Sequence, residues 1–131
     1  MRRIALLAAL LLAAQPLAAR PPHLIGSWGG PGVGIAFQGG LADVKFDCAS
    51  GTIDAPVYPA RKSGAFEVRG TYRAGTPGPV RVGQIFTSQP ATYSGKVTKS
   101  GMTLTVVLED GTGIGPFTLT QGAAPQIARC L

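Results

Sequence analysis

Apolar and polar residues alternate along much of this chain with a period of two. Such alternation predicts strands with one buried face. We expect these strands at residues 24–28, 33–38, 42–47, 66–73, 80–87, 91–98, 102–109 and 114–121. No stretch after Ala19 places apolar residues at helical spacing. The sequence therefore predicts an all-β fold.

Glycines and prolines separate the expected strands. Gly39 and Gly40 suit a two-residue hairpin turn between two strands. Short strands with turn signals roughly every 8–12 residues are typical of antiparallel barrels and sandwiches. Seven or eight strands are enough to close a sheet on itself, and closure removes unpaired edges. We expect one small antiparallel β-barrel domain at residues 20–131.

The start of the chain has the build of a secretory signal peptide. Two arginines precede an uninterrupted apolar run at residues 4–14, and Ala18 and Ala19 supply the small residues of a cleavage site. As a helix the run rises only about 16 Å, roughly half of a bilayer core, which disfavours a permanent anchor. We predict a cleaved signal helix at residues 1–19, a mature form without a transmembrane anchor, and a periplasmic or secreted location.

Cys48 and Cys130 are the two cysteines of the chain. Outside the cytosol, an isolated pair of cysteines indicates a disulfide bond. A catalytic thiol or a two-cysteine metal site is the alternative, but the chain has no CxxC spacing and its single histidine is His23. We therefore predict a bond between Cys48 and Cys130 and no metal.

Short motifs resemble those of known barrels. Residues 26–28, Gly-Ser-Trp, resemble the G-x-W that opens the first strand of lipocalins and avidin-like barrels, and residues 64–66 and 70–72 are similar to the G-x-F and G-x-Y of avidin-type hairpins. The resemblance implies that Trp28 closes one end of a barrel. The remaining residues of a biotin site have no counterparts, so biotin binding is not implied. The chain from Trp28 to Leu131 also resembles small exported bacterial proteins of unassigned activity.

The sequence offers few groups for catalysis. It lacks the G-x-S-x-G of α/β hydrolases, and His23 stands beside Pro22 near the predicted mature terminus. Asp43 and Asp47 share the polar side of one expected strand with Lys45, as on a solvated surface. Neither a calcium loop nor a phosphate-binding glycine loop fits the spacing. We expect no enzymatic activity and no cofactor.

The formal net charge is +6, and basic residues cluster in the middle of the chain. The cluster consists of Arg61, Lys62, Arg69, Arg73 and Arg81. It suits either an anionic partner or a solubilising surface. Nucleic-acid binding is not expected, because the nearby aromatic residues Phe66 and Tyr72 fall on the predicted core side instead of an exposed stacking surface.

These observations favour an extracytoplasmic, non-enzymatic binding module. Its partner would be a small apolar ligand or an envelope protein. The candidate binding residues are Trp28, Tyr72, Tyr93, Arg69 and Arg73, with Tyr58 as a further aromatic candidate. An inhibitor or accessory protein of a secreted or envelope enzyme is the alternative, with residues 55–63 and 75–79 as contact loops. A small hydrolase that uses the aspartates is a third hypothesis.

Overall fold

The computed structural model describes residues 22–75, 82–83 and 87–130. These residues form eight strands and no helix, which confirms the predicted all-β class. The strands are β1 (Gly26–Gly30), β2 (Val33–Gln38), β3 (Leu41–Phe46), β4 (Ala49–Ile53), β5 (Ala65–Ala74), β6 (Gln89–Val97), β7 (Gly101–Leu108) and β8 (Gly113–Gln121). In this part of the chain no helix could cross a bilayer. The predicted export signal lies outside the described residues.

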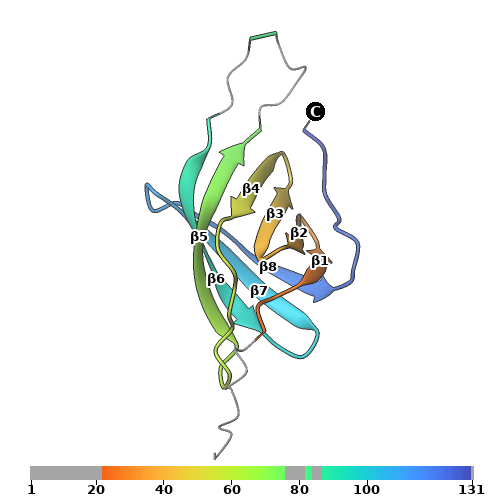
Figure 1. Cartoon of the computed structure of the whole chain (residues 1–131). Helices are drawn as coiled ribbons and strands as arrows, with labels where there is room; N and C mark the ends of the chain where they lie inside the picture. Colours follow the sequence, from red (N-terminus) through yellow and green to blue (C-terminus); the bar gives the residue numbers. More distant parts are fainter. Residues whose placement is uncertain (1–21, 76–81, 84–86, 131) are drawn as a thin grey trace, which may run out of the picture.

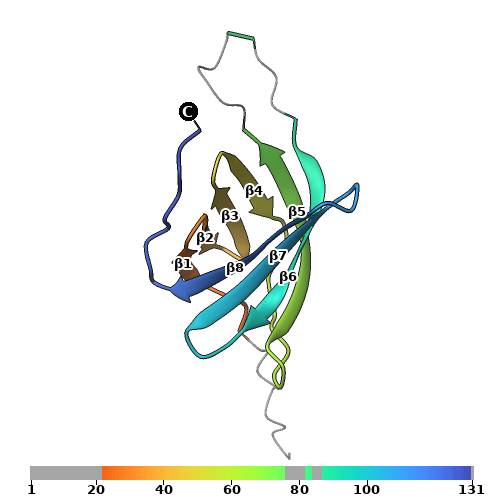
Figure 2. The same cartoon turned by 180° about the vertical axis from the view of Figure 1, so that it is seen from behind.

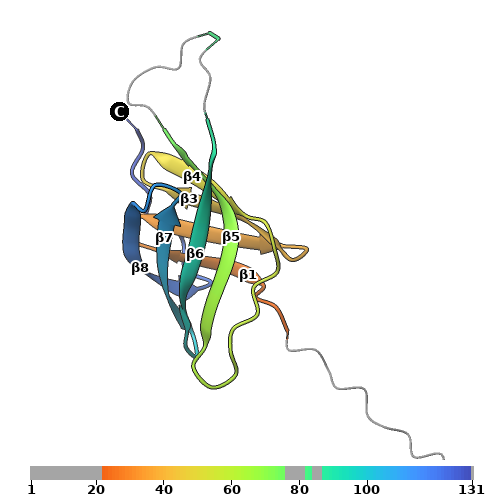
Figure 3. The ribbon, with the colours of Figure 1, turned by 90° about the vertical axis from the view of Figure 1, so that its left-hand side faces the viewer.

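The eight strands close into an antiparallel barrel in which each strand pairs with the next along the chain. Closure joins β1 to β8, where Trp28 pairs with Gln121 and Gly29 with Thr120. Figures 1 and 2 show the barrel from opposite sides, and in Figure 3 β5 to β8 lie across the direction of β1, β3 and β4. The expected small barrel is confirmed, and closure leaves no long unpaired edge.

Because successive strands alternate in direction, the connections gather at two ends. The proximal end consists of the N-terminal residues 22–25 and the connections 39–40, 54–64 and 98–100. The distal end consists of the connections 31–32, 47–48 and 109–112 and the described residues between β5 and β6. In Figure 1 the chain enters the barrel from below, through the proximal end.

Seven of the eight expected strands coincide with observed ones. The exception is the strand expected at residues 80–87, most of which lies outside the described residues. In its described part the prediction is wrong, because Val82 and Gly83 form a turn and Thr87 belongs to no strand. The eighth strand is β4, which the alternation did not predict.

In β4 the buried Ile53 is the one large inward-facing side chain, because at Gly51 an aromatic ring from another strand fills the interior. A Cβ at Gly51 of β4 would contact the hydroxyl of Tyr93 and the carbonyl oxygen of Thr71. On the neighbouring strand, a Cβ at Gly70 would lie 2.9 Å from Cε2 of Tyr93. Two glycines therefore make room for one tyrosine, and the sequence of β4 carries no apolar alternation.

Side chains fill the interior of the barrel. The largest fully buried ones are Tyr93, Ile53, Leu104, Leu119, Val33, Val44, Val57 and Val106. Phe66 is buried and Tyr72 packs against the core, as the alternation predicts. Among the described residues, no buried side-chain nitrogen or oxygen lacks a hydrogen-bond partner. Within the part of the chain that the structure describes, the axis of the barrel is thus a packed core.

The C-terminal residues 122–130 run back from β8 to the distal end, outside the barrel (Figure 1). There Cys130 forms the predicted disulfide with Cys48, with the two Cα atoms 4.6 Å apart. On the way, the Gln126 amide donates to the Gly30 carbonyl oxygen at 3.1 Å, and the Gly32 amide donates to the Gln126 carbonyl oxygen at 2.8 Å. The disulfide and the backbone hydrogen bonds hold this tail against β1 and β2.

Two paired glycines form the surface beneath the tail. Gly29 and Gly34 face each other across β1 and β2. A Cβ at Gly34 would lie 2.5 Å from Cγ of Pro125, and one at Gly29 would lie 2.8 Å from the carbonyl carbon of Ala124. These positions need glycine because the tail packs directly on the backbone of the sheet.

Candidate functional site

The structure does not gather the predicted binding residues into one site. Trp28 is 3% exposed and Tyr93 is 0% exposed, so both belong to the core. Tyr72 is half-buried and packs on Phe46, with ring centroids 5.4 Å apart. Of the three aromatic candidates, Trp28 alone lines a pocket given below.

Tyr93 has a structural role. Its hydroxyl donates a hydrogen bond to the Thr71 carbonyl oxygen at 2.6 Å. Burial raises the pKa of Tyr93 well above its ordinary value, and nearby Tyr72 and Asp54 raise it further. The phenol therefore stays protonated as a donor inside the barrel. Its prediction as a binding residue is corrected, because no surface ligand reaches a fully buried side chain.

Arg69 and Arg73 are exposed on the outer side of β5, as the alternation predicts. Arg73 lines a shallow groove of about 400 Å³ over β3, β4 and β5, together with Lys45 and Asp43. The groove carries charges of both signs, and Arg69 does not line it. The outer surface of β5 thus carries two arginines and Glu67, and it does not join the two arginines into one pocket.

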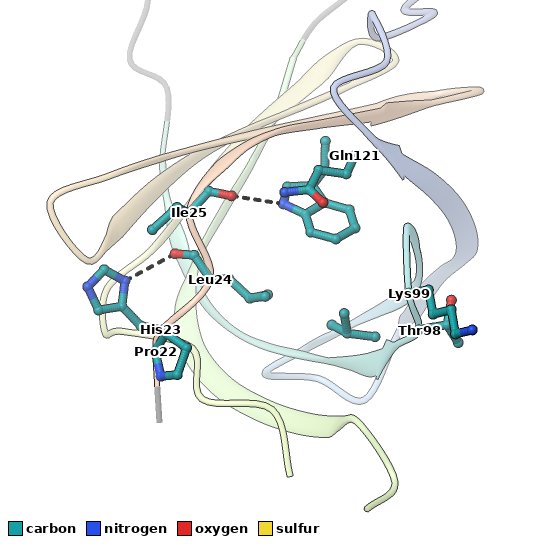
Figure 4. Close-up of a pocket in the computed structure, with 9 residues that line it drawn as sticks. Pro22, His23, Leu24, Ile25, Thr98, Lys99 and Gln121 are labelled. Carbon is teal, nitrogen blue, oxygen red and sulfur yellow. Dashed lines mark hydrogen bonds between the residues drawn. The ribbon is translucent and has the colours of Figure 1, made fainter. Parts of the chain in front are cut away.

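A pocket of about 390 Å³ opens at the proximal end of the barrel (Figure 4). Its lining comes from three parts of the chain: the N-terminal segment with the first half of β1, the end of β6 with the turn to β7, and the end of β8. The lining residues are Pro22, His23, Leu24, Ile25, Trp28, Val97, Thr98, Lys99 and Gln121. The volume falls in the range of roughly 300–1,000 Å³ that is usual for small-molecule sites.

The floor of this proximal pocket is apolar. It includes Trp28 and Leu24, and Figure 4 shows Leu24 directed toward the middle of the pocket. The indole Nε1 of Trp28 donates to the Ile25 carbonyl oxygen at 3.2 Å. Because this bond satisfies the indole nitrogen, the ring offers a ligand an apolar surface in a fixed position.

The rim of the proximal pocket is polar. His23 bonds through Nδ1 to the Leu24 carbonyl oxygen at 3.1 Å, while Thr98 and Lys99 stand on the opposite side (Figure 4). Gln121 completes the rim, which contains no Asp or Glu. An apolar floor beneath neutral and cationic polar groups suits a small molecule with an apolar body and a polar or anionic head.

Of the pocket residues, sequence reasoning found only Trp28. Leu24, Val97 and Gln121 come from the beginning, middle and end of the fold, and pairing of Trp28 with Gln121 brings β8 beside β1. No local motif links these residues. Their proximity follows from closure of the barrel.

The described residues offer little to a metal ion or to acid–base chemistry. They include no group of three or more His, Cys, Asp or Glu side chains placed to hold a metal. The carboxylate of Asp54 accepts a hydrogen bond from Thr52 at 2.7 Å, and that of Asp47 accepts one from the Ala128 amide at 2.7 Å. These two carboxylates thus stabilise local structure.

The chain matches no known protein family, no curated protein and no solved structure.

Proposed function

We propose that the protein is an extracytoplasmic binding module without catalytic activity of its own. The proximal pocket takes a small molecule with an apolar body and a polar head. The observation that carries this proposal is the division of the fold into a packed core and an open pocket with Trp28 as its floor. A filled barrel directs a ligand to the end of the fold.

An extracytoplasmic location is consistent with the disulfide between Cys48 and Cys130. The proposed route is export through the signal at residues 1–19, followed by residence in the periplasm or the medium. The G-x-W resemblance fits the same proposal, since Trp28 lies at one end of the barrel.

Trp28 is the single tryptophan of the chain, so its fluorescence reports directly on the pocket. We expect decanoate, titrated below its micellar concentration into residues 20–131, to change this fluorescence in a saturable way. 1-Decanol has the same apolar chain without the carboxylate and serves as the uncharged comparison. We expect decanoate to bind more tightly than 1-decanol, because its carboxylate lies near the cationic Lys99. No saturable change with either probe would refute the small-ligand proposal.

A matched pair of substitutions on β8 tests whether the ligand binds in the proximal pocket. Gln121 lines the pocket, whereas the neighbouring Thr120 is exposed and does not. Gln121→Phe should obstruct the pocket and weaken decanoate binding about tenfold, which corresponds to about 1.4 kcal/mol. Thr120→Phe should leave the affinity unchanged. Equal effects of the two substitutions would place the ligand elsewhere, and turnover of generic ester, glycoside or peptide substrates would refute the non-enzymatic proposal.

One observation favours an inhibitor or accessory protein as the second candidate. The connection 54–64 is anchored by buried Val57, whose carbonyl oxygen accepts from the Leu24 amide at 2.9 Å, and by a 2.7 Å bond from the Gly64 amide to the Ala60 carbonyl oxygen. An anchored loop that exposes Tyr58 suits protein recognition. Under this alternative, the protein inhibits a hydrolase of the culture medium and Tyr58→Ser abolishes the inhibition. The other predicted contact loop, residues 75–79, lies largely outside the described residues.

A further inference from the structure

Three large apolar side chains are exposed on neighbouring segments of the proximal end. Ile25 is 64% exposed, Leu41 is 53% exposed and Tyr58 is 47% exposed. They come from the N-terminal segment, the start of β3 and the connection 54–64, respectively. We name these three residues the apolar tips. Each projects from a different segment, so together they form separate points instead of one flat patch.

The segments that carry the apolar tips are joined to one another. The amide of Leu24 donates to the Val57 carbonyl oxygen at 2.9 Å, which ties the N-terminal segment to the connection 54–64. Pro56 packs on the turn before β3, where a Cβ at Gly40 would lie 3.3 Å from its Cγ. The rings of His23 and Tyr58 meet edge to face, with centroids 6.1 Å apart. The tips are therefore presented by a connected surface.

Bases outnumber acids in the described connections of the proximal end, although Leu41 itself shares a groove with Asp43 and Asp54. The described connections of the proximal end contain the exposed bases Arg61, Lys62 and Lys99 and one acid, Asp54. Exposed cations beside protruding apolar side chains are the combination that holds a peripheral protein on an anionic lipid surface, because each part contributes to binding.

In the described connections of the distal end, acids outnumber bases. Its described connections contain the acids Asp47, Glu109 and Asp110, and the tail that reaches this end adds one base, Arg129. Judged by the described residues, an anionic surface therefore attracts the proximal end more strongly than the distal end, which favours approach through the proximal end.

The path of the chain agrees with this orientation. Seven residues separate the apolar run at residues 4–14 from Pro22 at the proximal end. Even fully extended, seven residues span at most about 25 Å. A chain that is still attached to a membrane through this run therefore has the proximal end as its membrane-facing end.

We propose that the proximal end docks on an anionic lipid bilayer. Ile25, Leu41 and Tyr58 enter the interfacial region, and Arg61 and Lys62 meet the lipid phosphates. The proposal goes beyond ligand binding in the proximal pocket and does not depend on it, since the apolar tips Leu41 and Tyr58 do not line that pocket.

Vesicle sedimentation with residues 20–131, which include the eight described strands and both cysteines, tests the proposal. We expect binding to vesicles of phosphatidylglycerol and phosphatidylcholine in equal parts, and at least about tenfold weaker partitioning into pure phosphatidylcholine. Raising the salt concentration from 0.05 to about 0.5 M should also weaken binding to the anionic vesicles. Absence of binding, or equal partitioning into both kinds of vesicle, would overturn the proposal.

Variants then locate the docking surface. The double substitution Leu41→Ser and Tyr58→Ser, and separately Arg61→Glu with Lys62→Glu, should each lower partitioning into anionic vesicles about tenfold. Because all four side chains are exposed, the thermal unfolding midpoint should stay close to that of the parent protein.

Matched controls lie elsewhere on the barrel. Val82→Ser and Arg129→Glu change an exposed apolar residue and an exposed base of the distal connections and the tail, and Arg69→Glu changes the outer surface of β5. All three should retain most of the binding. Loss of binding with Arg69→Glu but not with the Arg61 and Lys62 pair would overturn docking through the proximal end. Unchanged binding of both proximal variants would overturn it as well.

Discussion

Removal of the disulfide measures how far the barrel depends on its tail. Cys48 and Cys130 are separated by 82 residues, so the bond closes most of the barrel into one loop. In the chain-entropy model, a loop of this length restricts the unfolded state enough to stabilise the fold by about 4.5 kcal/mol. The 2.7 Å hydrogen bond from the Ala128 amide to Asp47 does not involve sulfur, so without the disulfide it can still hold the tail loosely against the barrel. We therefore expect Cys48→Ser with Cys130→Ser to lower the free energy of unfolding by about 4 kcal/mol.

Urea unfolding followed by the fluorescence of Trp28 provides the measurement. The variant should unfold at lower urea concentration and with a steeper dependence on urea, because an unfolded chain without the cross-link exposes more surface. Thiol labelling of the non-reduced parent protein should detect no free cysteine. A loss below about 1 kcal/mol with an unchanged urea dependence would refute the argument from unfolded-state entropy.

Two further predictions concern close packing in the barrel. Because the folded-state pKa of Tyr93 is raised above its ordinary value of 10.0, the unfolded state loses this proton first, and stability should fall by about 1.4 kcal/mol per pH unit above pH 10. Tyr93→Phe should reduce that pH dependence. Near neutral pH it should lower the free energy of unfolding by about 1–2 kcal/mol, because the hydrogen bond to Thr71 is lost. Equal pH dependence of the variant and the parent protein, measured by urea unfolding at pH 9–11, would contradict this. Gly34→Ala should cost about 1–3 kcal/mol by displacing Pro125, and less in the variant without the disulfide, where the tail is free to shift. A double-mutant cycle measures this coupling, and additive costs would argue against it.

The sequence predicted the strands that carry large inward-facing residues. In β7, Met102, Leu104 and Val106 alternate with outward-facing residues, and all three are buried. The pattern failed at β4 because Gly51 lies beneath a tyrosine from another strand. With glycine at this inward position, Ile53 is the only large apolar side chain of β4, and one such residue makes no period that a local pattern can detect.

The candidate site was harder to predict than the strands. Period-two alternation placed Phe66 inside and Arg69 outside, but it carries no information about depth along the barrel. Trp28 came to line a pocket at one end, whereas Tyr93 became part of the packed core. Whether an inward-facing side chain is buried in the core or lines an open pocket depends on which strands pair with one another. The alternation of apolar and polar residues does not contain that information.

By itself, the sequence determined the all-β class and the sidedness of most strands, because side chains alternate across a strand whatever its neighbours are. It also supplied the two cysteines, whose isolation indicated the disulfide. The tertiary structure decided which residues share a surface. Closure of β1 on β8 built the proximal pocket, and three separate connections brought Ile25, Leu41 and Tyr58 to one end. These groupings arise from contacts between residues far apart in the chain, for which a single sequence carries no periodic signal.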